Sequence, residues 1–355
     1  MTTAAQEGMA LPGTIDVAVI GGGQAALAAG FFLRRTSLSY VLFDDRPGPG
    51  GAWRHGWPSL RLFSPARWSS LPGWLMPAGS DAYPTRDETL DYLAAYEERY
   101  ALPIVRPVRV LSTHADGDRL RLVTDHGDVS AGAVISATGT WGAPVIPSFD
   151  GAQHFCGRVI HSAQYAGPQE FAGQRVLVVG GGNSGAQIFA DLLDHARVSW
   201  VTREPPTFLP DEVDGQYLFE QGTARFQAIK EGRTPEPPRS LGDVVMVAPV
   251  RAARDSGRLT WRALFTRFTR DGVVWPDGSE ERIDAVILAT GFKPDLAHLA
   301  PIAAPDERGR LAMQGLHASA HPRLFPLGYG DWTGYASATL IGCGRAAKAV
   351  VEQLS

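Results

Sequence analysis

The hydrophobic pattern of the chain repeats one unit twice: a short apolar run, a glycine turn and a helix-like stretch. Residues 15–35 read IDVAVIGGGQAALAAGFFLRR, and residues 175–193 read RVLVVGGGNSGAQIFADLL. The apolar run before each turn predicts a buried strand, and the longer stretch beyond the glycines predicts a helix. Two such units predict an α/β fold with two Rossmann-like dinucleotide-binding domains.

Each glycine turn follows the spacing of a dinucleotide-binding turn. Its positions are filled by Gly21, Gly23 and Ala26 in the first unit and by Gly180, Gly182, Asn183, Ser184 and Gly185 in the second. In such a turn the first glycine permits the bend, the second lets a pyrophosphate approach the backbone, and the third position packs helix on strand. The helix begins with free N–H groups that face the phosphates.

The second predicted strand of each unit ends in a different charge. YVLFDD leads to Asp44, and RVSWVTR leads to Arg203, equally far beyond the first glycine of its unit. An acid accepts hydrogen bonds from ribose hydroxyls, whereas a guanidinium binds an additional 2′-phosphate. These residues predict FAD in the first unit and NADPH in the second. Glu204 would repel a 2′-phosphate or accept from the ribose of NADH, so NADH stays an alternative, and Arg203 could also be a solvated charge.

Further elements are expected between and beyond the two units. Thr85 and Glu88 have the spacing of a capping box ahead of an amphipathic helix over 85–100. Apolar runs predict strands at 104–112, 119–124 and 128–137. The proline-rich segment 204–257 predicts a loop-rich excursion with one helix around 214–231.

Two further motifs follow predicted strands, one that indicates domain crossings and one that indicates a binding role. AVISATGT (133–140) and AVILATGF (285–292) end alike in A-T-G, which indicates a sharp exit where the chain crosses between domains. Near the C-terminus, Gly330 and Asp331 stand between a strand-like run and a small-residue helix. An acid at a strand end can bind a polyol hydroxyl, and the following helix N-terminus can stabilise negative charge on a reduced ring.

Composition narrows the classes of partner. The 355 residues suffice for two or three domains, and 33 basic against 37 acidic residues, with no basic block, argue against nucleic acid and anionic membranes. Cys156 and Cys343 are too far apart in sequence for a local redox dithiol or a cysteine zinc site. Without a signal-like N-terminus or a long apolar run, we expect a soluble cytoplasmic protein that binds a small molecule, with a homodimer as the default assembly.

A more specific motif lies between the two units. FCGRVIHSAQY supplies Phe155, Gly157, His161 and Tyr165 in the order F-x-G-x-x-x-H-x-x-x-Y, and GGAW supplies Gly50, Gly51 and Trp53. With both glycine turns, these motifs resemble the flavin-containing and Baeyer–Villiger monooxygenases. The chain looks closest to the short bacterial flavin-containing monooxygenases that accept NADPH or NADH.

That resemblance implies a fold and an activity. The fold would be three-layered and similar to glutathione reductase, with residues 1–145 and 291–355 binding FAD and residues 146–290 binding NAD(P)H. NAD(P)H would reduce FAD, and O2 would then give a flavin carbon-4a (hydro)peroxide. This species would oxygenate a sulfide, an amine, an arsenical or a ketone.

The resemblance also assigns roles to residues. His161 would couple cofactor binding to flavin chemistry, and Phe155 and Tyr165 would be packing anchors. Gly50, Gly51 and Trp53 would lie beside the flavin. Trp53, Trp57, Trp68 and Trp74 could form dry walls near the flavin or simply be core aromatics.

Two other functions share the nucleotide motifs. An NAD(P)H-dependent flavin reductase would pass electrons to a quinone or a protein acceptor, and a regulatory protein would bind NAD(P)H without turnover. The fingerprint from Phe155 to Tyr165 favours the monooxygenase over both. A reductase of the thioredoxin-reductase type would need a cysteine pair, which the sequence lacks.

Overall fold

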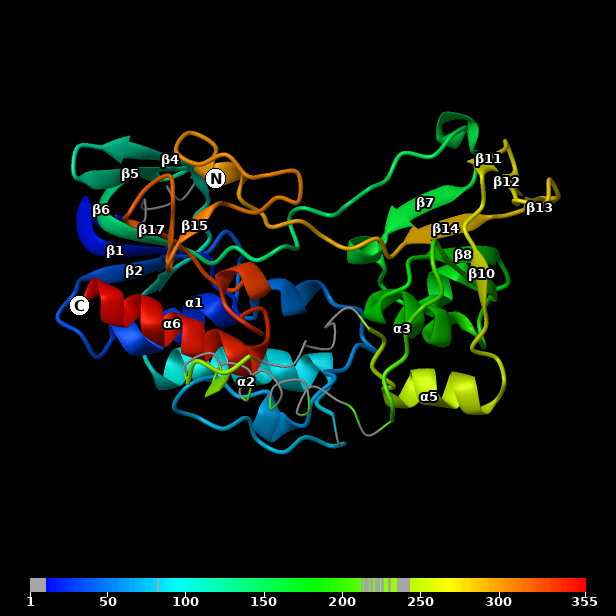
Figure 1. Ribbon diagram of the computed structural model, residues 1–355, viewed down its shortest axis with the longest axis horizontal. Helices are drawn as coiled ribbons and strands as arrows, with labels where there is room; N and C mark the ends of the chain where they lie inside the picture. The colour runs from blue at the N-terminus through cyan, green and yellow to red at the C-terminus, as the bar shows by residue number, and fades with distance from the viewer. Residues whose placement is uncertain are drawn as a thin grey trace, which may run out of the picture.

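The computed structural model describes residues 11–81, 83–211 and 243–355, together with residues 213, 217, 220, 224, 227, 228 and 231–234. These residues form two lobes joined by two extended connections (Figure 1). Most of the helix expected around 214–231 lies outside the described residues. Within the described part of the chain, no helix combines the length and the apolar character that crossing a membrane requires.

The first lobe is built on a seven-stranded sheet, counted over the described residues, in the order β3-β2-β1-β6-β5-β4, with β17 also paired to β6. The strands are β1 (Thr14–Ile20), β2 (Tyr40–Phe43), β3 (Ile104–Val105), β4 (Val110–Asp116), β5 (Arg119–Thr124), β6 (Gly127–Ser136) and β17 (Leu324–Pro326). The prediction of one strand over 104–112 was wrong. Pro107, which has no N–H to donate to a ladder, separates β3 from β4.

Alternation along β1 explains why this sheet is covered on both faces. Val17 and Val19 pack into the hydrophobic cluster formed with the helices α1 (Gln24–Leu33), α2 (Arg86–Arg99) and α6 (Leu340–Leu354). Ala18 and Ile20 pack into the opposite cluster, with residues of β4 and β5. Side chains alternate across a strand, so an apolar run of this kind requires a layer on each side.

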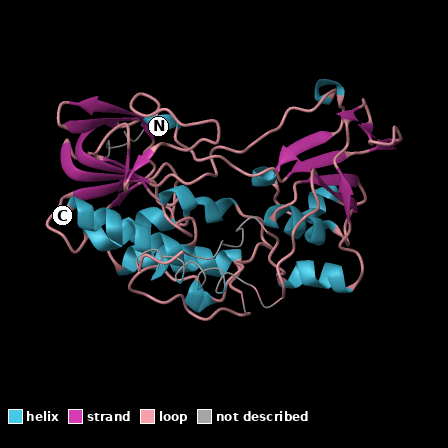
Figure 2. Ribbon diagram, in the orientation of Figure 1, coloured by secondary structure: helices cyan, strands magenta, loops and turns pink. Residues whose placement is uncertain are grey.

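The second lobe has a five-stranded parallel sheet among the described residues, in the order β10-β9-β8-β14-β7. Its strands are β7 (Arg158–His161), β8 (Arg175–Val179), β9 (Arg197–Thr202), β10 (Trp261–Ala263) and β14 (Ala285–Leu288). One face carries α3 (Asn183–Leu192) and α5 (Ala248–Asp255), and the other carries β11 (Arg267–Phe268), β12 (Gly272–Val274) and β13 (Glu280–Arg282). Figure 2 shows this layering in both lobes. The expected three-layer α/β architecture is confirmed.

The helix predicted over 85–100 is also confirmed, as α2. The Thr85 hydroxyl accepts from the Glu88 N–H at 3.1 Å, and the Glu88 carboxylate accepts from the Thr85 N–H at 2.8 Å. The hydrogen bonds that the Glu88 carboxylate accepts from the backbone N–H groups of Thr85 and Ser80 lower its pKa to about 2. The cap fixes where α2 begins, and α2 carries Glu97 towards the first nucleotide turn.

The two connections between the lobes run side by side. The chain leaves the first sheet after β6, forms the second lobe and returns through the short hairpin of β15 (Met313–Gln314) and β16 (His317–Ala318) to β17. Residues 139–145 pair with 291–295 through three backbone bonds: Val145 N to Gly291 O, Lys293 N to Ala143 O and Asp295 N to Gly139 O, each 2.9 Å. Both A-T-G endings therefore mark the crossings, as the sequence pattern predicts.

Candidate functional site

The first glycine of each turn is required by a neighbouring strand end. Gly21 and Gly180 have φ values of +120° and +138°, a region that favours glycine. A Cβ on Gly21 would overlap the carbonyl of Ala137, and one on Gly180 would overlap the carbonyl of Ala289. Ala137 and Ala289 are the alanines of the two A-T-G sequences, so each glycine turn and its A-T-G form one packed unit.

A second glycine pair completes the first turn. Gly50 and Gly51 have φ values of +104° and +52°, and a Cβ on Gly51 would lie 2.7 Å from the Cα of Gly23. The Trp53 indole N–H donates to the Gln24 side-chain carbonyl at 3.2 Å. The glycine backbones of Gly23 and Gly51 thus lie against each other at the start of α1.

These segments line a cavity of about 620 Å³ in the first lobe. Its wall includes residues 20–25, 43–46, 50–53, 108–111, 137–142, 295, 297, 298, 327, 328 and 338. Exposed glycine backbone together with a helix N-terminus suits a pyrophosphate, and an acid at the end of β2 suits a ribose. The residues present therefore fit FAD.

The sequence-predicted residues divide into three groups around this cavity. Gly21, Gly23, Asp44, Gly50, Gly51 and Trp53 all line it. Ala26 is fully buried and packs α1 on the sheet instead. Asp331 is exposed at the start of a 3₁₀ turn, and the described cavity wall after β17 includes Leu327, Gly328 and Ala338 but neither Gly330 nor Asp331.

Several lining residues were missed by sequence reasoning: Gly22, Gln24, Thr138, Trp141, Asp295 and His298. His298 belongs to a buried chain of polar groups, in which its Nε2 lies 3.1 Å from the Ser136 hydroxyl. The Tyr329 hydroxyl lies 2.7 Å from the hydroxyls of both Ser136 and Thr138. Burial lowers the pKa of His298 to about 4, so its imidazole is neutral at pH 7.

The second glycine turn is held by its own side chains. Gly182 caps α3, and the Asn183 amide donates to Asp243 O and accepts from the Val245 N–H, both at 2.9 Å. The Trp200 indole donates to the Gly180 carbonyl at 2.7 Å, and a Cβ on Gly185 would overlap that same carbonyl. The turn is therefore a rigid backbone cradle, which fits a second dinucleotide.

The polar side chains of this turn lie at its surface. Ser184 is half-buried at the start of α3. Arg203 and Glu204 follow the end of β9, and both are exposed. Among the described contacts, no ion pair involves Arg203. Its guanidinium is thus accessible to a ligand on the second turn.

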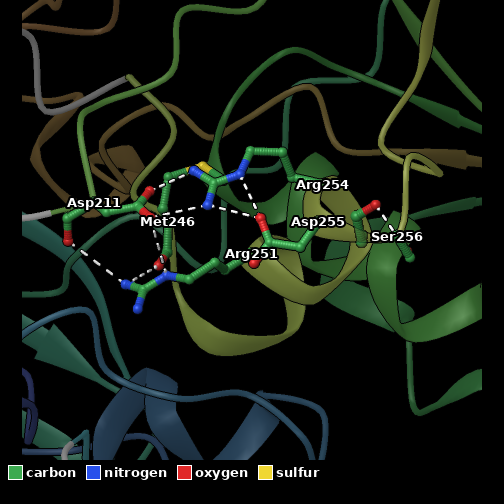
Figure 3. A network of polar contacts seen from close by, with 7 residues as sticks. Asp211, Met246, Arg251, Arg254, Asp255 and Ser256 are labelled. Atoms are coloured by element: carbon green, nitrogen blue, oxygen red, sulfur yellow. Dashed lines mark hydrogen bonds and ion pairs between the residues drawn. The ribbon is translucent and has the colours of Figure 1, made fainter.

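Ion pairs join Asp211, in the proline-rich segment 204–257, to the helix α5. Asp211 forms ion pairs with Arg251 and Arg254, and Arg254 also pairs with Asp255 (Figure 3). Arg251 further donates to the Met246 carbonyl at 3.0 Å. The ion pairs therefore hold Asp211 on α5, while Asn183 holds residues 243 and 245 beside the second turn.

His161 lies at the junction of the lobes. It ends β7 and is 2% exposed, its Nδ1 accepts from the Ala163 N–H, and its Nε2 lies 3.1 Å from Gly291 O. These contacts place the proton on Nε2, which donates to the connection between the lobes. Burial lowers the pKa of His161, so the ring is neutral at pH 7.

An aromatic stack leads from His161 to the cavity. Its ring meets Phe292 edge-on with centroids 4.9 Å apart, and Phe292 stacks on Trp141 at 5.2 Å. Trp141 lines the cavity and stacks in turn on His55 at 5.7 Å. The four rings come from four segments of the chain and connect the second sheet to the first cavity.

Tyr165 has a packing role in the structure. It is 1% exposed, its hydroxyl donates to the Asp191 carboxylate at 2.7 Å, and the Ser59 hydroxyl donates to the same carboxylate at 2.9 Å. Trp57 packs edge-on against Tyr165 at 5.8 Å, inside the helix-side core of the second lobe. Trp74 packs against Tyr92 in a tilted arrangement with ring centroids 5.1 Å apart, at the edge of the first lobe's core. Of these tryptophans, Trp53 lines the cavity, Trp57 is a core residue and Trp74 is partly buried against the core.

Comparisons with known proteins agree with this geometry. Residues 18–217 match the family described as pyridine nucleotide-disulphide oxidoreductase. A flavin-containing monooxygenase from Stenotrophomonas maltophilia is 48% identical with a TM-score of 0.88, covering 97% of this chain and 98% of that one. An indole-3-pyruvate monooxygenase, YUCCA4 of Oryza sativa subsp. japonica, is 30% identical over 81% of this chain and 76% of its own length.

A more distant neighbour shares the fold alone. The bacillithiol disulfide reductase of Bacillus cereus is 18% identical, with a TM-score of 0.74 over 96% of this chain and 98% of that one. Two dinucleotide-binding domains of this type are thus common to reductases and monooxygenases. The higher identities lie with the monooxygenases. The chain therefore belongs to the pyridine nucleotide-disulphide oxidoreductase family and, within it, is a flavin-dependent monooxygenase that uses FAD and a pyridine nucleotide.

Proposed function

We propose that residues 1–145 and 291–355 bind FAD, and that residues 146–290 bind NADPH. In the first domain the pyrophosphate lies over Gly21, Gly23, Gly50 and Gly51, and Asp44 accepts from the adenosine ribose. The observation that carries this proposal is the close approach of two glycine backbones, since a Cβ on Gly51 would lie 2.7 Å from the Cα of Gly23. With no side chains between them, backbone N–H groups at the start of α1 can face a ligand.

In the second domain, the turn of Gly180, Gly182 and Gly185 holds the NADPH pyrophosphate at the N-terminus of α3. Asn183 keeps the wall formed by residues 243–245 in place, and Ser184 lies beside the phosphates. Arg203, exposed at the end of β9, binds the 2′-phosphate. Gly330 and Asp331 follow β17 outside the described cavity wall, and binding of a flavin hydroxyl by the exposed Asp331 is part of this proposal.

Bound FAD supplies the chemistry, since it accepts a hydride from NADPH and, once reduced, activates O2 for transfer of one oxygen atom. The chain orients the ligands and excludes water. His161 holds the second domain on the connection through its Nε2–H bond to Gly291. Trp53 and Trp141 present apolar rings to the cavity, which limits the access of water.

For the substrate we propose a small molecule with a soft nucleophilic atom, with a sulfide as the first choice. The support is the fingerprint tyrosine, Tyr165, which is typical of flavin-containing monooxygenases, whereas the Baeyer–Villiger type carries tryptophan. A cyclic ketone, an amine, a trivalent arsenical and indole-3-pyruvate are the other substrates to compare. The last is taken from the name of the rice relative.

Coupling of NADPH consumption to product tests this proposal. The purified FAD-loaded protein is supplied with NADPH and O2, with and without an aryl methyl sulfide, while sulfoxide, H2O2 and NADPH are quantified together. We expect sulfoxide to approach one molecule for each NADPH consumed. Fast reduction of an added quinone, with H2O2 formed and no oxygenated product from any of these substrates, would instead support a flavin reductase.

Removal of the Arg203 guanidinium should affect NADPH alone. Arg203→Ala loses a charged hydrogen bond to the 2′-phosphate, so we expect the KM for NADPH to rise about 10- to 100-fold. The KM for NADH should stay within about twofold. Arg197→Ala, at the opposite end of β9 and also exposed, is the matched control. Equal changes for both nucleotides would contradict a 2′-phosphate contact.

A further inference from the structure

The Asp44 carboxylate is held in one orientation at the cavity wall. Asp44 is 2% exposed, its Oδ2 accepts from Arg106 Nε at 2.6 Å, and its Oδ1 accepts from the Arg46 N–H at 3.2 Å. On its other side, a Cβ on Gly22 would overlap Oδ2. An aspartate normally rotates about two side-chain bonds, but here it is confined between a guanidinium and a glycine.

Arg106 is itself held by a second acid. Its Nη1 and Nη2 donate to the two carboxylate oxygens of Glu97 at 2.7 and 2.6 Å. The side chains of Asp44, Arg106 and Glu97 are 3%, 15% and 11% exposed, so the whole chain of contacts is shielded from solvent. Because the guanidinium is planar, the bidentate bond to Glu97 directs Nε at Asp44.

Glu97 also sets the charge of this cluster. Burial raises the pKa of Glu97, although the hydrogen bonds and charge of Arg106 act in the opposite direction. With all three groups ionised, the cluster carries one net negative charge beside the cavity. If Glu97 were neutral, the charge of Asp44 would be balanced by Arg106 and its carboxylate would be a weaker acceptor. A net negative cluster also disfavours a phosphorylated ribose at this position.

We propose that Arg106 and Glu97 are positioning residues that give this protein its selectivity for the adenosine ribose of FAD. They act through Asp44, and neither touches the ligand, because neither lines the cavity. This inference rests on the proposed binding of FAD in the first cavity. It implies that the two residues contribute to the binding of FAD but not of FMN, which lacks the adenosine half.

The test compares the two flavins on the same apoprotein. The flavin is removed from the full-length protein, and Kd values for FAD and FMN are measured by flavin fluorescence. Arg106→Met keeps an unbranched side chain but removes the donors, and Glu97→Gln removes one charge. For each variant we expect the Kd of FAD to rise about tenfold or more, since a charged hydrogen bond is lost or misdirected. The Kd of FMN should stay within about twofold.

Two controls keep the result specific. Arg121→Met removes another partly exposed arginine of the same sheet, paired with Asp128 and absent from the described cavity wall, and should change neither Kd. In a background of Asp44→Asn, Arg106→Met should cause no further loss of FAD affinity. The wild type should bind FAD with a 2′-deoxyribose more weakly than it binds FAD. The Arg106 variant should bind these two ligands with equal affinity.

The outcomes separate this inference from the proposal beneath it. Equal loss of FAD and FMN affinity, or an effect that persists without Asp44, would show a general structural role and overturn the inference. An unchanged Kd for FAD would also overturn it. A wild-type apoprotein that binds neither flavin would remove the FAD proposal itself. If Arg106→Met does not fold, the Glu97 variant and the deoxyribose ligand decide the question.

Discussion

Replacing Gly22 with alanine should abolish tight FAD binding. Gly22 is at a variable position of the glycine turn, and its backbone does not require glycine, since its φ is not in the left-handed region. The expected loss of binding has a steric cause, because a Cβ on Gly22 would overlap the Asp44 carboxylate and lie 2.8 Å from the Asp44 Cβ. Displacing this carboxylate removes its bonds to the ribose, and we expect the Kd of FAD to rise about 100-fold or more.

The second turn contains the matched control. Gly181 is at the equivalent position, but the nearest atom to its Cβ would be Thr202 Cγ2 at 3.6 Å, an ordinary contact. Gly181→Ala should therefore leave the Kd of FAD unchanged and the KM for NADPH within about twofold. If both alanine variants bind FAD as the wild type does, the ribose contact of Asp44 is contradicted.

Replacing His161 with alanine should slow reduction of the flavin by NADPH about tenfold. The change removes the Nε2–H bond to Gly291 and the edge-on contact with Phe292, which together fix the second lobe on the connection. A hydrogen bond contributes about 0.5–1.5 kcal/mol, and each 1.36 kcal/mol is a factor of ten in rate. Stopped-flow absorbance under anaerobic conditions measures the rate directly.

Two comparisons separate domain positioning from general damage. The Kd of FAD should be unchanged in His161→Ala, and chemical reduction by dithionite should proceed at the wild-type rate. His154→Ala removes an exposed histidine of the neighbouring 3₁₀ turn and should have no effect. A His161 variant that is reduced by NADPH as fast as the wild type would leave the histidine with a structural role only.

Local signals explain what the sequence could predict. The two glycine turns, the capping box of α2 and the A-T-G endings are each set by residues within a few positions of one another. Their spacing reflects backbone sterics and local hydrogen bonding, so each can be read from a short stretch of sequence. The two-domain α/β fold follows because each buried strand needs a covering layer on both faces. Pro107 was the local signal overlooked in the expected strand over 104–112.

Long-range contacts explain what the sequence could not predict. Asp44 was a candidate because it ends a predicted strand, but its partner Arg106 and the supporting Glu97 lie far along the chain and belong to no motif. The polar chain of His298, Ser136 and Tyr329 is likewise assembled from three segments. Such groups are brought together by the sheet order, which a residue pattern does not specify.

The motif from Phe155 to Tyr165 illustrates both what residue spacing can predict and what it cannot. Its spacing indicated the family, yet the structure gives its two polar residues different tasks. His161 bonds to the connection between the lobes, whereas Tyr165 is buried in the core of the second lobe and bonds to Asp191. The spacing of the motif cannot distinguish these two roles, because it specifies only the residue types and how far apart they stand.

Isotope labelling tests the central claim most directly. The FAD-loaded protein is supplied with NADPH and an aryl methyl sulfide under ¹⁸O2, and the sulfoxide is analysed by mass spectrometry. The account predicts one ¹⁸O atom in each sulfoxide molecule and one NADPH consumed for each product, with little H2O2. Sulfoxide that carries oxygen from water, or product that disappears when catalase removes H2O2, would contradict a monooxygenase that transfers oxygen within its own site.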